Sequence, residues 1–265
     1  MVKITVLNDN RCNNKRLECE HGLSLFIDNN DEKILFDAGQ TDIFLKNASK
    51  LGVDLDDIDS IVLSHGDYDH GNGLKYFNKK VKLICHPNFT KNRISKRTGK
   101  FDGLNESLEE IKSKFILITT KKPYNISDNI TYLGEIEKTT DFEKGKNLPM
   151  IDENGEVYSH LDDSGIAIKL HNSIIVISGC AHSGICNTVE YAKKITKCNN
   201  VLAVMGGFHL KEIDEQAKKT IKYMKDNNIK HILVAHCTSD TVCTEFKKEL
   251  PNETEIVETG KTYVF

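Results

Sequence analysis

The sequence has 265 residues, of which 38% are hydrophobic and 28% charged. These values are typical of a soluble globular protein with one large domain or two small ones. The formal net charge of −3 favours neither a nucleic-acid partner nor an anionic membrane. No apolar run approaches the ~20 residues of a membrane-spanning helix, and the first ten residues lack a signal-peptide core. We therefore expect a cytoplasmic protein with a small-molecule substrate, and the oligomeric state stays open.

Short β-type runs alternate with helical stretches along the chain, which predicts an α/β fold. Strands are predicted at 3–7, 23–27, 33–39, 60–64, 81–85, 115–119, 130–134, 165–170, 173–178, 201–205, 231–236 and 255–259. Helices are predicted at 41–52, 104–114, 187–197, 214–228 and 240–250. Several strands are β-branched and continuously apolar, which favours burial on both faces.

Local signals refine this assignment. Ala217, Ile221 and Met224 recur at helical spacing, Asp214 is the expected N-cap of that helix, and Asn187 is the expected N-cap of the helix at 187–197. We expect a single domain over 1–265, in which 86–160 is a possible insertion or lid. The polar stretch 138–160 fits a lid or a plain surface excursion equally well.

The eight cysteines do not form a disulfide scaffold. None belongs to a C-x-x-C pair, and Cys85, Cys180 and Cys198 lie in or beside apolar runs. We expect reduced, buried thiols. The basic stretch KNRISKRTGK (91–100) predicts a solvated loop, with anion binding as the alternative.

Ligand-type side chains recur where predicted strands end. His65 ends the strand at 60–64, and Asp67, Asp69 and His70 follow in LSHGDYDHGNGL (63–74). Asp37, His182, His209 and His236 follow other apolar strands. Sites in layered α/β structures form from the loops at strand ends. Imidazole and carboxylate groups suit Zn²⁺, and also Mn or Fe. His65 and Asp67 can share one ion, while Asp69 and His70 can serve a second ion.

These motifs resemble those of a known family. The pattern H-x-D-x-D-H (65–70), FDAG (36–39) before it, and SGCAHSGI (178–185), GGFHL (206–210) and HCT (236–238) after it are similar to the metallo-β-lactamase superfamily. They look like its branch of dihydropterin–ribofuranosylaminobenzene-phosphate synthases. The resemblance runs from about residue 3 to the C-terminus and is weakest over 90–160. It implies an αββα sandwich of two mixed sheets flanked by helices.

The resemblance also implies a dinuclear metal centre with Zn as the first expectation. His65, Asp67 and His182 would hold one divalent ion, and Asp69, His70 and His236 the other. Asp37 would support the ligands through hydrogen bonds. His209 stands near the place of a bridging aspartate in many relatives, so metal ligation, substrate contact and a structural role stay open.

Asp67 stands where the commonest pattern has a third histidine. A carboxylate there adds one negative charge and favours harder ions such as Mn or Fe. The missing bridging carboxylate near His209 would compensate for that charge. In the alternative reading, Asp67 only forms hydrogen bonds within its turn.

Other polar residues have simpler readings. His21, His160, His171 and His231 are expected to be structural or exposed, and His86 to stabilise its loop. Asp162 and Asp163 suit a turn or cap, with a substrate-side role as the alternative. Cys180 and Cys237 are expected to pack rather than to bind metal.

The first functional hypothesis is a metal-dependent hydrolase, in which a metal-bridging hydroxide attacks an ester, phosphoester or lactone-like small molecule. Asp69 would orient the nucleophile as well as bind metal, so Asp69 and Asp37 are the candidate catalytic residues. The alternatives are a pterin-type transferase that releases diphosphate and a non-hydrolytic di-iron redox protein. A metal-binding sensor ranks below these because no output element is evident.

Overall fold

The computed structural model describes residues 1–96, 98–143 and 150–265. The chain forms two compact units. Unit 1 consists of Met1–Lys121, Asn147–Asp162 and Glu258–Phe265, and unit 2 of Lys122–Lys146 and Asp163–Val257. The single domain over 1–265 and the lid at 86–160 stay predictions, and residues 97 and 144–149 of that region lie outside the described residues.

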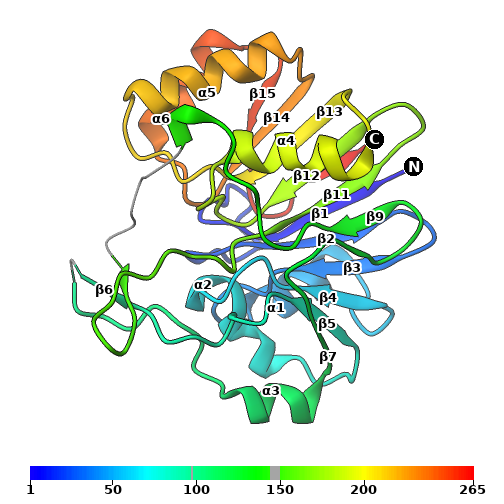
Figure 1. Cartoon of the computed structure of the whole chain (residues 1–265). Helices are drawn as coiled ribbons and strands as arrows, with labels where there is room; N and C mark the ends of the chain where they lie inside the picture. Colours follow the sequence, from blue (N-terminus) through cyan, green and yellow to red (C-terminus); the bar gives the residue numbers. More distant parts are fainter. Residues whose placement is uncertain (97, 144–149) are drawn as a thin grey trace. The chain divides into compact units, whose positions relative to one another are not determined.

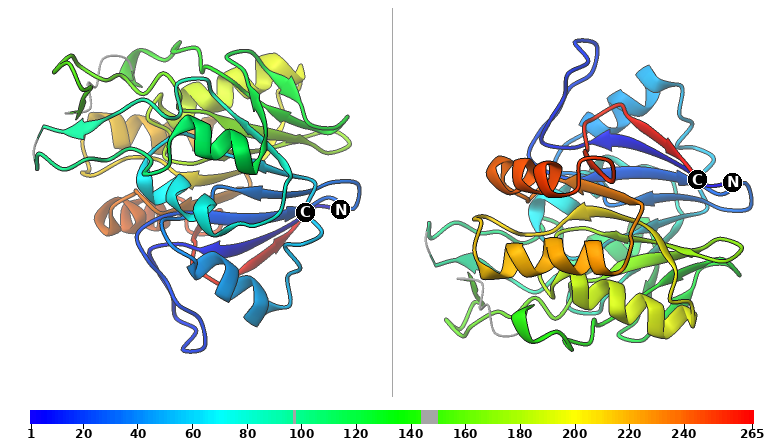
Figure 2. Two further views of the ribbon diagram at one scale, coloured as in Figure 1. Left: turned by 90° about the horizontal axis from the view of Figure 1, so that it is seen from below. Right: turned by 90° about the horizontal axis from the view of Figure 1, so that it is seen from above.

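Unit 1 contains a seven-stranded mixed sheet with the order β16-β1-β2-β3-β4-β5-β7. The strands are β1 (Lys3–Asn8), β2 (Ser24–Asp28), β3 (Lys33–Phe36), β4 (Ser60–Val62), β5 (Lys82–Cys85), β7 (Ile116–Thr119) and β16 (Thr262–Val264). Pairing is antiparallel from β16 to β3 and parallel from β3 to β7. Figure 2 shows β1 and β16, the two ends of the chain, side by side.

Helices and short elements complete unit 1. Helix α1 (Ile43–Leu51) contributes Phe44 to a hydrophobic core with Leu35 and Ile61 of the sheet. Helix α3 (Leu108–Lys114) begins with a capping box between Ser107 and Glu110. The remaining elements are α2 (Tyr68–Gly71), the 3₁₀ helix η1 (Asn72–Tyr76) and the paired two-residue strands β6 (Ile94–Ser95) and β10 (Met150–Ile151).

Unit 2 contains a second seven-stranded mixed sheet with the order β15-β14-β13-β12-β11-β9-β8. Its strands are β8 (Tyr124–Asn125), β9 (Ile130–Tyr132), β11 (Gly165–Lys169), β12 (Ile174–Ser178), β13 (Val201–Gly207), β14 (His231–Ala235) and β15 (Thr254–Ile256). The strands from β12 to β15 run parallel. Helices α4 (Ile185–Thr196), α5 (Glu215–Asp226) and α6 (Asp240–Glu249) lie along this sheet (Figure 1). Their apolar residues share one core with strand residues of the sheet, namely Ala167, Ile174, Val176, Val201, Val204, Ile232 and Val234.

The structure confirms most predicted elements of both units. Each predicted strand and helix is present with bounds shifted by a few residues, and Asp214 caps α5 by accepting a hydrogen bond from the Ala217 N–H at 2.9 Å. Ala217 and Met224 are buried in the core. The sequence did not reveal β6, β8, β10, β16 or α2, because elements of two to four residues carry too little periodicity.

The predicted cap of α4 is wrong. The helix begins at Ile185 with Gly184 at the N-cap, and Asn187 lies in its first turn. Instead, the carboxylate of Glu143, in the 3₁₀ helix η2 (Asp141–Glu143), accepts hydrogen bonds from the N–H groups of Cys186 (3.0 Å) and Asn187 (2.7 Å). A distant segment therefore supplies the acceptor that the local sequence lacks.

All eight cysteines are free thiols. Cys85 and Cys180 are buried as expected, but Cys198 is only half-buried. Among the described residues, every helix is too short or too polar to cross a membrane.

Candidate metal centre

The carboxylate of Asp37 lies at the end of β3, fully buried, and organises two histidines of unit 1. Its Oδ2 is 2.7 Å from Nδ1 of His70 and also accepts the hydroxyl hydrogen bond of Ser64 at 2.7 Å. The Ser64 hydroxyl is in turn 2.8 Å from Nδ1 of His65. Because the hydroxyl proton points to Asp37, Ser64 accepts from His65. Both imidazoles thus carry their proton on Nδ1, which makes Nε2 the nitrogen suited to bind a metal.

Nε2 of His65 and Nε2 of His70 lie near the carboxylates of Asp67 and Asp69 in the same loop. The rings of His65 and His70 have centroids 4.2 Å apart. His65 Nε2 lies 3.3 Å from Asp67 Oδ2, and His70 Nε2 lies 3.9 Å from Asp69 Oδ2. Unit 1 therefore brings together His65, Asp67, Asp69, His70 and Asp37, as the sequence predicted, while their roles as ligands stay predictions.

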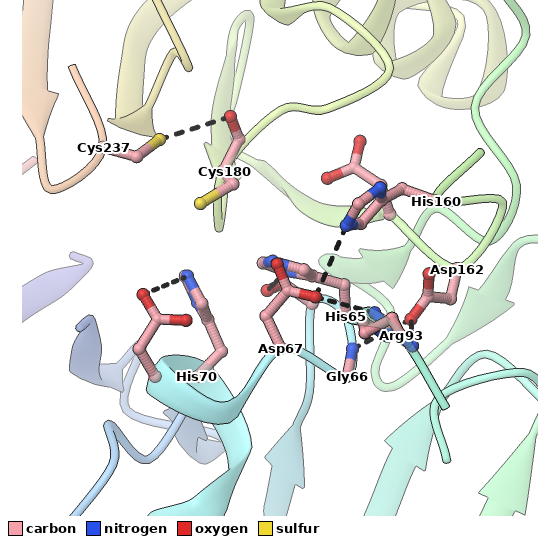
Figure 3. A network of polar contacts seen from close by, with 12 residues as sticks. His65, Gly66, Asp67, His70, Arg93, His160, Asp162, Cys180 and Cys237 are labelled. Carbon is pink, nitrogen blue, oxygen red and sulfur yellow. Dashed lines mark hydrogen bonds and ion pairs between the residues drawn. The ribbon is translucent and has the colours of Figure 1, made fainter. Parts of the chain in front are cut away.

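Asp67 has a partner that the sequence analysis missed. The guanidinium of Arg93 donates to Asp67 Oδ1 at 2.8 Å and to Asp162 Oδ2 at 2.9 Å, and Arg93 is fully buried (Figure 3). The expectation of a solvated 91–100 loop is therefore wrong for Arg93, although Lys91, Lys96 and Lys100 are exposed. This arginine offsets part of the charge that Asp67 adds, because the same guanidinium also pairs with Asp162.

Asp162 anchors the arginine from the other side. Its Oδ1 accepts the Tyr158 hydroxyl at 2.6 Å, and its Oδ2 also accepts the Gly66 N–H at 2.9 Å. Only glycine fits at position 66, because a Cβ there would meet the Phe89 carbonyl oxygen at 1.7 Å. The Tyr158 ring also stacks on the Arg93 guanidinium at 4.5 Å.

The pKa shifts show how strongly these charges interact. Burial would raise the pKa of Asp162, but the positive charge of Arg93, followed by His160 and His65, lowers it to about 2. Burial opposes the charge of Arg93 too, yet Asp162 and then Asp67 raise its pKa above the ordinary value. This cluster is an ionised pair at neutral pH.

His160 and His21, which are expected to be structural or exposed, lie beside the carboxylates of Asp67 and Asp69. His160 is buried, and its Nε2 lies 3.4 Å from Asp67 Oδ1 (Figure 3). His21, whose side chain is 52% exposed, places Nε2 3.1 Å from Asp69 Oδ2. These contacts hold the two carboxylates in place, and no local sequence signal marks either histidine.

A negative local field surrounds the loop of Asp67 and Asp69. Burial, followed by the charges of these two carboxylates, raises the pKa of Asp102. Burial and then Asp69 raise the pKa of Tyr68 to about 12. The loop is therefore an environment that favours a cation.

Unit 2 presents the later histidines at the ends of neighbouring parallel strands. His182 follows β12, His209 follows β13 and His236 follows β14. Because parallel strands place their carboxyl ends on one edge, these residues gather there. The rings of His182 and His209 have centroids 4.5 Å apart, and His209 Nδ1 is buried with no hydrogen-bond partner among the described residues.

Strained backbone marks the residues at these strand ends. Eight non-glycine residues among those described have positive φ; they include Asp37 and His160 of unit 1, and Ala181, His209 and His236 after the strands of unit 2. Each such conformation costs on the order of 1–3 kcal/mol and persists only where the surrounding structure enforces it. This concentration is typical of a functional site.

Two cysteines accompany the histidines of unit 2. The Cys237 thiol donates to the Cys180 carbonyl oxygen at 3.6 Å (Figure 3). Burial would raise the pKa of the Cys237 thiol, but its contacts with Cys180 and His209, and the positive charges of His209 and His236, lower it well below the ordinary value. Both cysteines are buried, as expected for side chains that pack, while their role as ligands stays open.

Comparison with known proteins identifies the family. Residues 17–86 match the model of the metallo-beta-lactamase superfamily. Over its full length the chain is 33% identical to the 7,8-dihydropterin-6-methyl-4-(beta-D-ribofuranosyl)-aminobenzene-5'-phosphate synthase of Methanocaldococcus jannaschii, of which it covers 97%. The chain belongs to the metallo-β-lactamase superfamily.

Two further relatives are similar to the chain over nearly its whole length. An uncharacterised protein of Methanocaldococcus jannaschii is 34% identical, with 94% of both chains covered. The crystal structure of a metal-dependent hydrolase of the beta-lactamase superfamily matches with a TM-score of 0.85 at 28% identity, covering 100% of this chain and 99% of that one. The metallo-β-lactamase fold class, with two mixed sheets flanked by helices, is thus confirmed, and the branch resemblance holds.

The residues present fit a divalent cation of the kind that this superfamily binds. Unit 1 offers imidazoles whose protons are fixed on Nδ1, carboxylates in a negative field, and an aspartate that orients the imidazoles. Unit 2 offers histidines of which one has a buried nitrogen without a hydrogen-bond partner. Such a set of nitrogen and oxygen donors binds Zn, Mn or Fe. The identity and number of ions stay predictions.

Proposed function

We propose that the chain is a metal-dependent hydrolase of an ester, phosphoester or lactone-like small molecule. One observation carries this proposal: Asp37 accepts from His70 directly and from His65 through Ser64, in a fully buried position. Hydrogen bonds to Nδ1 of this kind fix the ring orientation and leave Nε2 for a ligand, as is usual for metal-binding histidines. The metal-dependent hydrolase of 28% identity supports the same reaction class.

The residues of unit 1 have distinct roles in this proposal. A bound divalent ion would supply Lewis acidity and lower the pKa of water. Asp37 holds the proton of His70 at Nδ1, and Arg93 holds Oδ1 of Asp67 and leaves Oδ2 toward His65. Asp69, whose carboxylate contacts His21, would orient the attacking water as well as bind metal. The grouping of these ligands with His182 and His236 into a dinuclear zinc centre stays a prediction.

The proposal is tested with protein purified without oxygen. We expect bound Zn or Mn in elemental analysis and metal-dependent hydrolysis of one member of a panel of phosphodiesters, lactones and thioesters. Asp69→Asn should abolish that hydrolysis, whereas His171→Gln, at an exposed histidine, serves as the control. Hydrolysis that persists in Asp69→Asn, or after removal of all metal, would contradict the proposal.

A second candidate function rests on the full-length match to the synthase of Methanocaldococcus jannaschii at 33% identity. In that case the chain would be a pterin-type transferase, and diphosphate would leave the substrate. Release of diphosphate that depends on a dihydropterin co-substrate would favour this activity over hydrolysis. Bound iron with a visible absorption band would instead favour the di-iron redox alternative.

A further inference from the structure

Two thiol side chains and one imidazole meet at one edge of the unit 2 sheet. Cys180 follows β12, His209 follows β13 and Cys237 follows β14. The Sγ atoms of both cysteines and a ring nitrogen of His209 all lie within 4.8 Å of one another. The proposed hydrolase uses none of these thiols, so they require a separate explanation.

The backbone around these residues is built to bring them together. The Gly207 N–H donates to the Gly179 carbonyl oxygen at 2.9 Å, which fixes the end of β13 against the segment before Cys180. A Cβ at position 207 would lie 2.5 Å from the Cys237 Sγ and 2.6 Å from the Gly179 oxygen. The thiol of Cys237 therefore occupies the space that any other residue at 207 would fill.

Two polar atoms of this group, the Cys237 sulfur and Nδ1 of His209, could gain from a bound ligand. The Cys237 thiol donates at 3.6 Å to a backbone carbonyl, which is a weak bond for a sulfur donor. Nδ1 of His209 is buried without a hydrogen-bond partner among the described residues. Both cysteines are buried, with exposed fractions of 4% for Cys180 and 6% for Cys237. A buried, unbonded nitrogen costs free energy that a ligand would recover.

We propose that Cys180, His209 and Cys237 form a metal subsite with sulfur ligands that takes a borderline-soft divalent ion such as Zn²⁺. Zinc binds thiolate at ~2.3 Å and imidazole at ~2.0 Å, and the tetrahedral arrangement sets its ligand atoms about 3.5–4 Å apart. The observed group is bounded by 4.8 Å, so its side chains must move closer together when the ion binds. The two thiol protons pass to solvent when the metal–sulfur bonds form, and the fourth position stays open to water or substrate.

The proposal goes beyond the proposed function because it gives the enzyme sulfur ligands. Two thiolates shift the metal preference of this edge from Mn toward Zn. The preference expected from Asp67 is the opposite one, for harder ions. The chain would thus hold ligand sets of different softness in its two units.

The test uses the full chain, stripped of metal under reducing, oxygen-free conditions and titrated with Co²⁺. Sulfur ligation produces a thiolate-to-cobalt charge-transfer band in the near ultraviolet. We expect this band in the wild type and in Cys198→Ser, a half-buried control in unit 2. Cys180→Ser and Cys237→Ser should each weaken it, and the double variant should lack it. Cys180→Ala and Cys237→Ala provide a second pair if the buried hydroxyl impairs folding.

The outcomes separate this inference from the proposed function. Cobalt uptake without the sulfur band in the wild type overturns the subsite with sulfur ligands alone. A band that survives in the double variant of Cys180 and Cys237 has the same meaning. A sulfur band in a protein whose cobalt content is unchanged by His70→Ala supports the subsite and contradicts the proposed hydrolase ligands. Absence of any cobalt uptake overturns both.

Discussion

Asp37 receives hydrogen bonds from the Ser64 N–H, the Ser64 hydroxyl and His70 Nδ1, all at 2.7 Å. Asp37→Asn keeps the shape of the side chain but removes the charge and one acceptor oxygen. We expect metal affinity to fall by about 10–100-fold, the usual effect of losing such a supporting group. Isothermal titration with Zn²⁺ measures it, with the exposed Asp31→Asn as control. Unchanged affinity would show that Asp37 has only a structural role.

The buried Arg93 pairs with the buried Asp162 and with Asp67, whose side chain is 14% exposed, and its loss leaves both carboxylates uncompensated. We expect Arg93→Met to lower the free energy of unfolding by about 3–5 kcal/mol, as for other broken buried ion pairs. Urea denaturation at neutral pH measures the change. Arg93→Met with Asp162→Asn should recover part of the loss, because one unpaired charge is then removed. A loss below about 1 kcal/mol, the value of a surface pair, would contradict this role.

Asp162 makes stability depend on pH in the acid range. Its pKa is about 2 in the folded chain against an ordinary value of 3.8, so the unfolded chain takes up the proton first as the pH falls. The stabilisation, on the order of 2 kcal/mol, is fully present above about pH 4 and is lost as the pH falls toward 2. Unfolding free energies of wild type and Asp162→Asn should therefore converge over that window. Asp128→Asn, at an exposed aspartate, should leave the slope unchanged.

Among the elements, α4 depends on a distant acceptor. The Glu143 carboxylate binds the N–H groups of Cys186 and Asn187, and burial raises its pKa despite these hydrogen bonds. We expect Glu143→Ala to lower the free energy of unfolding by about 2 kcal/mol, because two buried N–H groups lose their acceptor. Thermal denaturation checks this, with Asp141→Ala, an exposed residue of the same 3₁₀ helix, as control. Equal effects of the two substitutions would contradict the capping role.

The elements also show what local sequence can and cannot predict. Strands such as β12 and helices such as α5 follow from apolar patterns within a short window, and the structure confirms them. The cluster His65–His70 was recognisable because its ligand-type residues are adjacent. Arg93 was not recognisable as part of the site, because its partners Asp67 and Asp162 are 26 and 69 residues away in the sequence. The lysines near it in the sequence are solvated. His160 and His21 were missed for the same reason.

At the scale of the whole molecule, metal should stabilise the folded chain against the unfolded one. A ligand present at 100 times its dissociation constant contributes about 2.7 kcal/mol if it binds only the folded state. We expect Zn²⁺ to raise the thermal midpoint and a chelator to lower it. The double variant His65→Ala, His70→Ala should show a smaller response, because the subsite proposed in unit 2 would still bind Zn²⁺. A midpoint that is insensitive to metal in the wild type would contradict the proposed metal dependence.

The pairing of β1 with β16 has a consequence for how the chain folds. Lys3 pairs with Val264, and Thr259 accepts the Asp9 N–H, so contacts within unit 1 join segments separated by nearly the whole sequence. Closing such long loops costs entropy before any contact compensates for it, and a high contact order slows folding. No fragment that ends before residue 258 contains all of unit 1. Nascent or truncated chains would therefore leave the edge of β1 unpaired, which makes them prone to aggregation and dependent on chaperones.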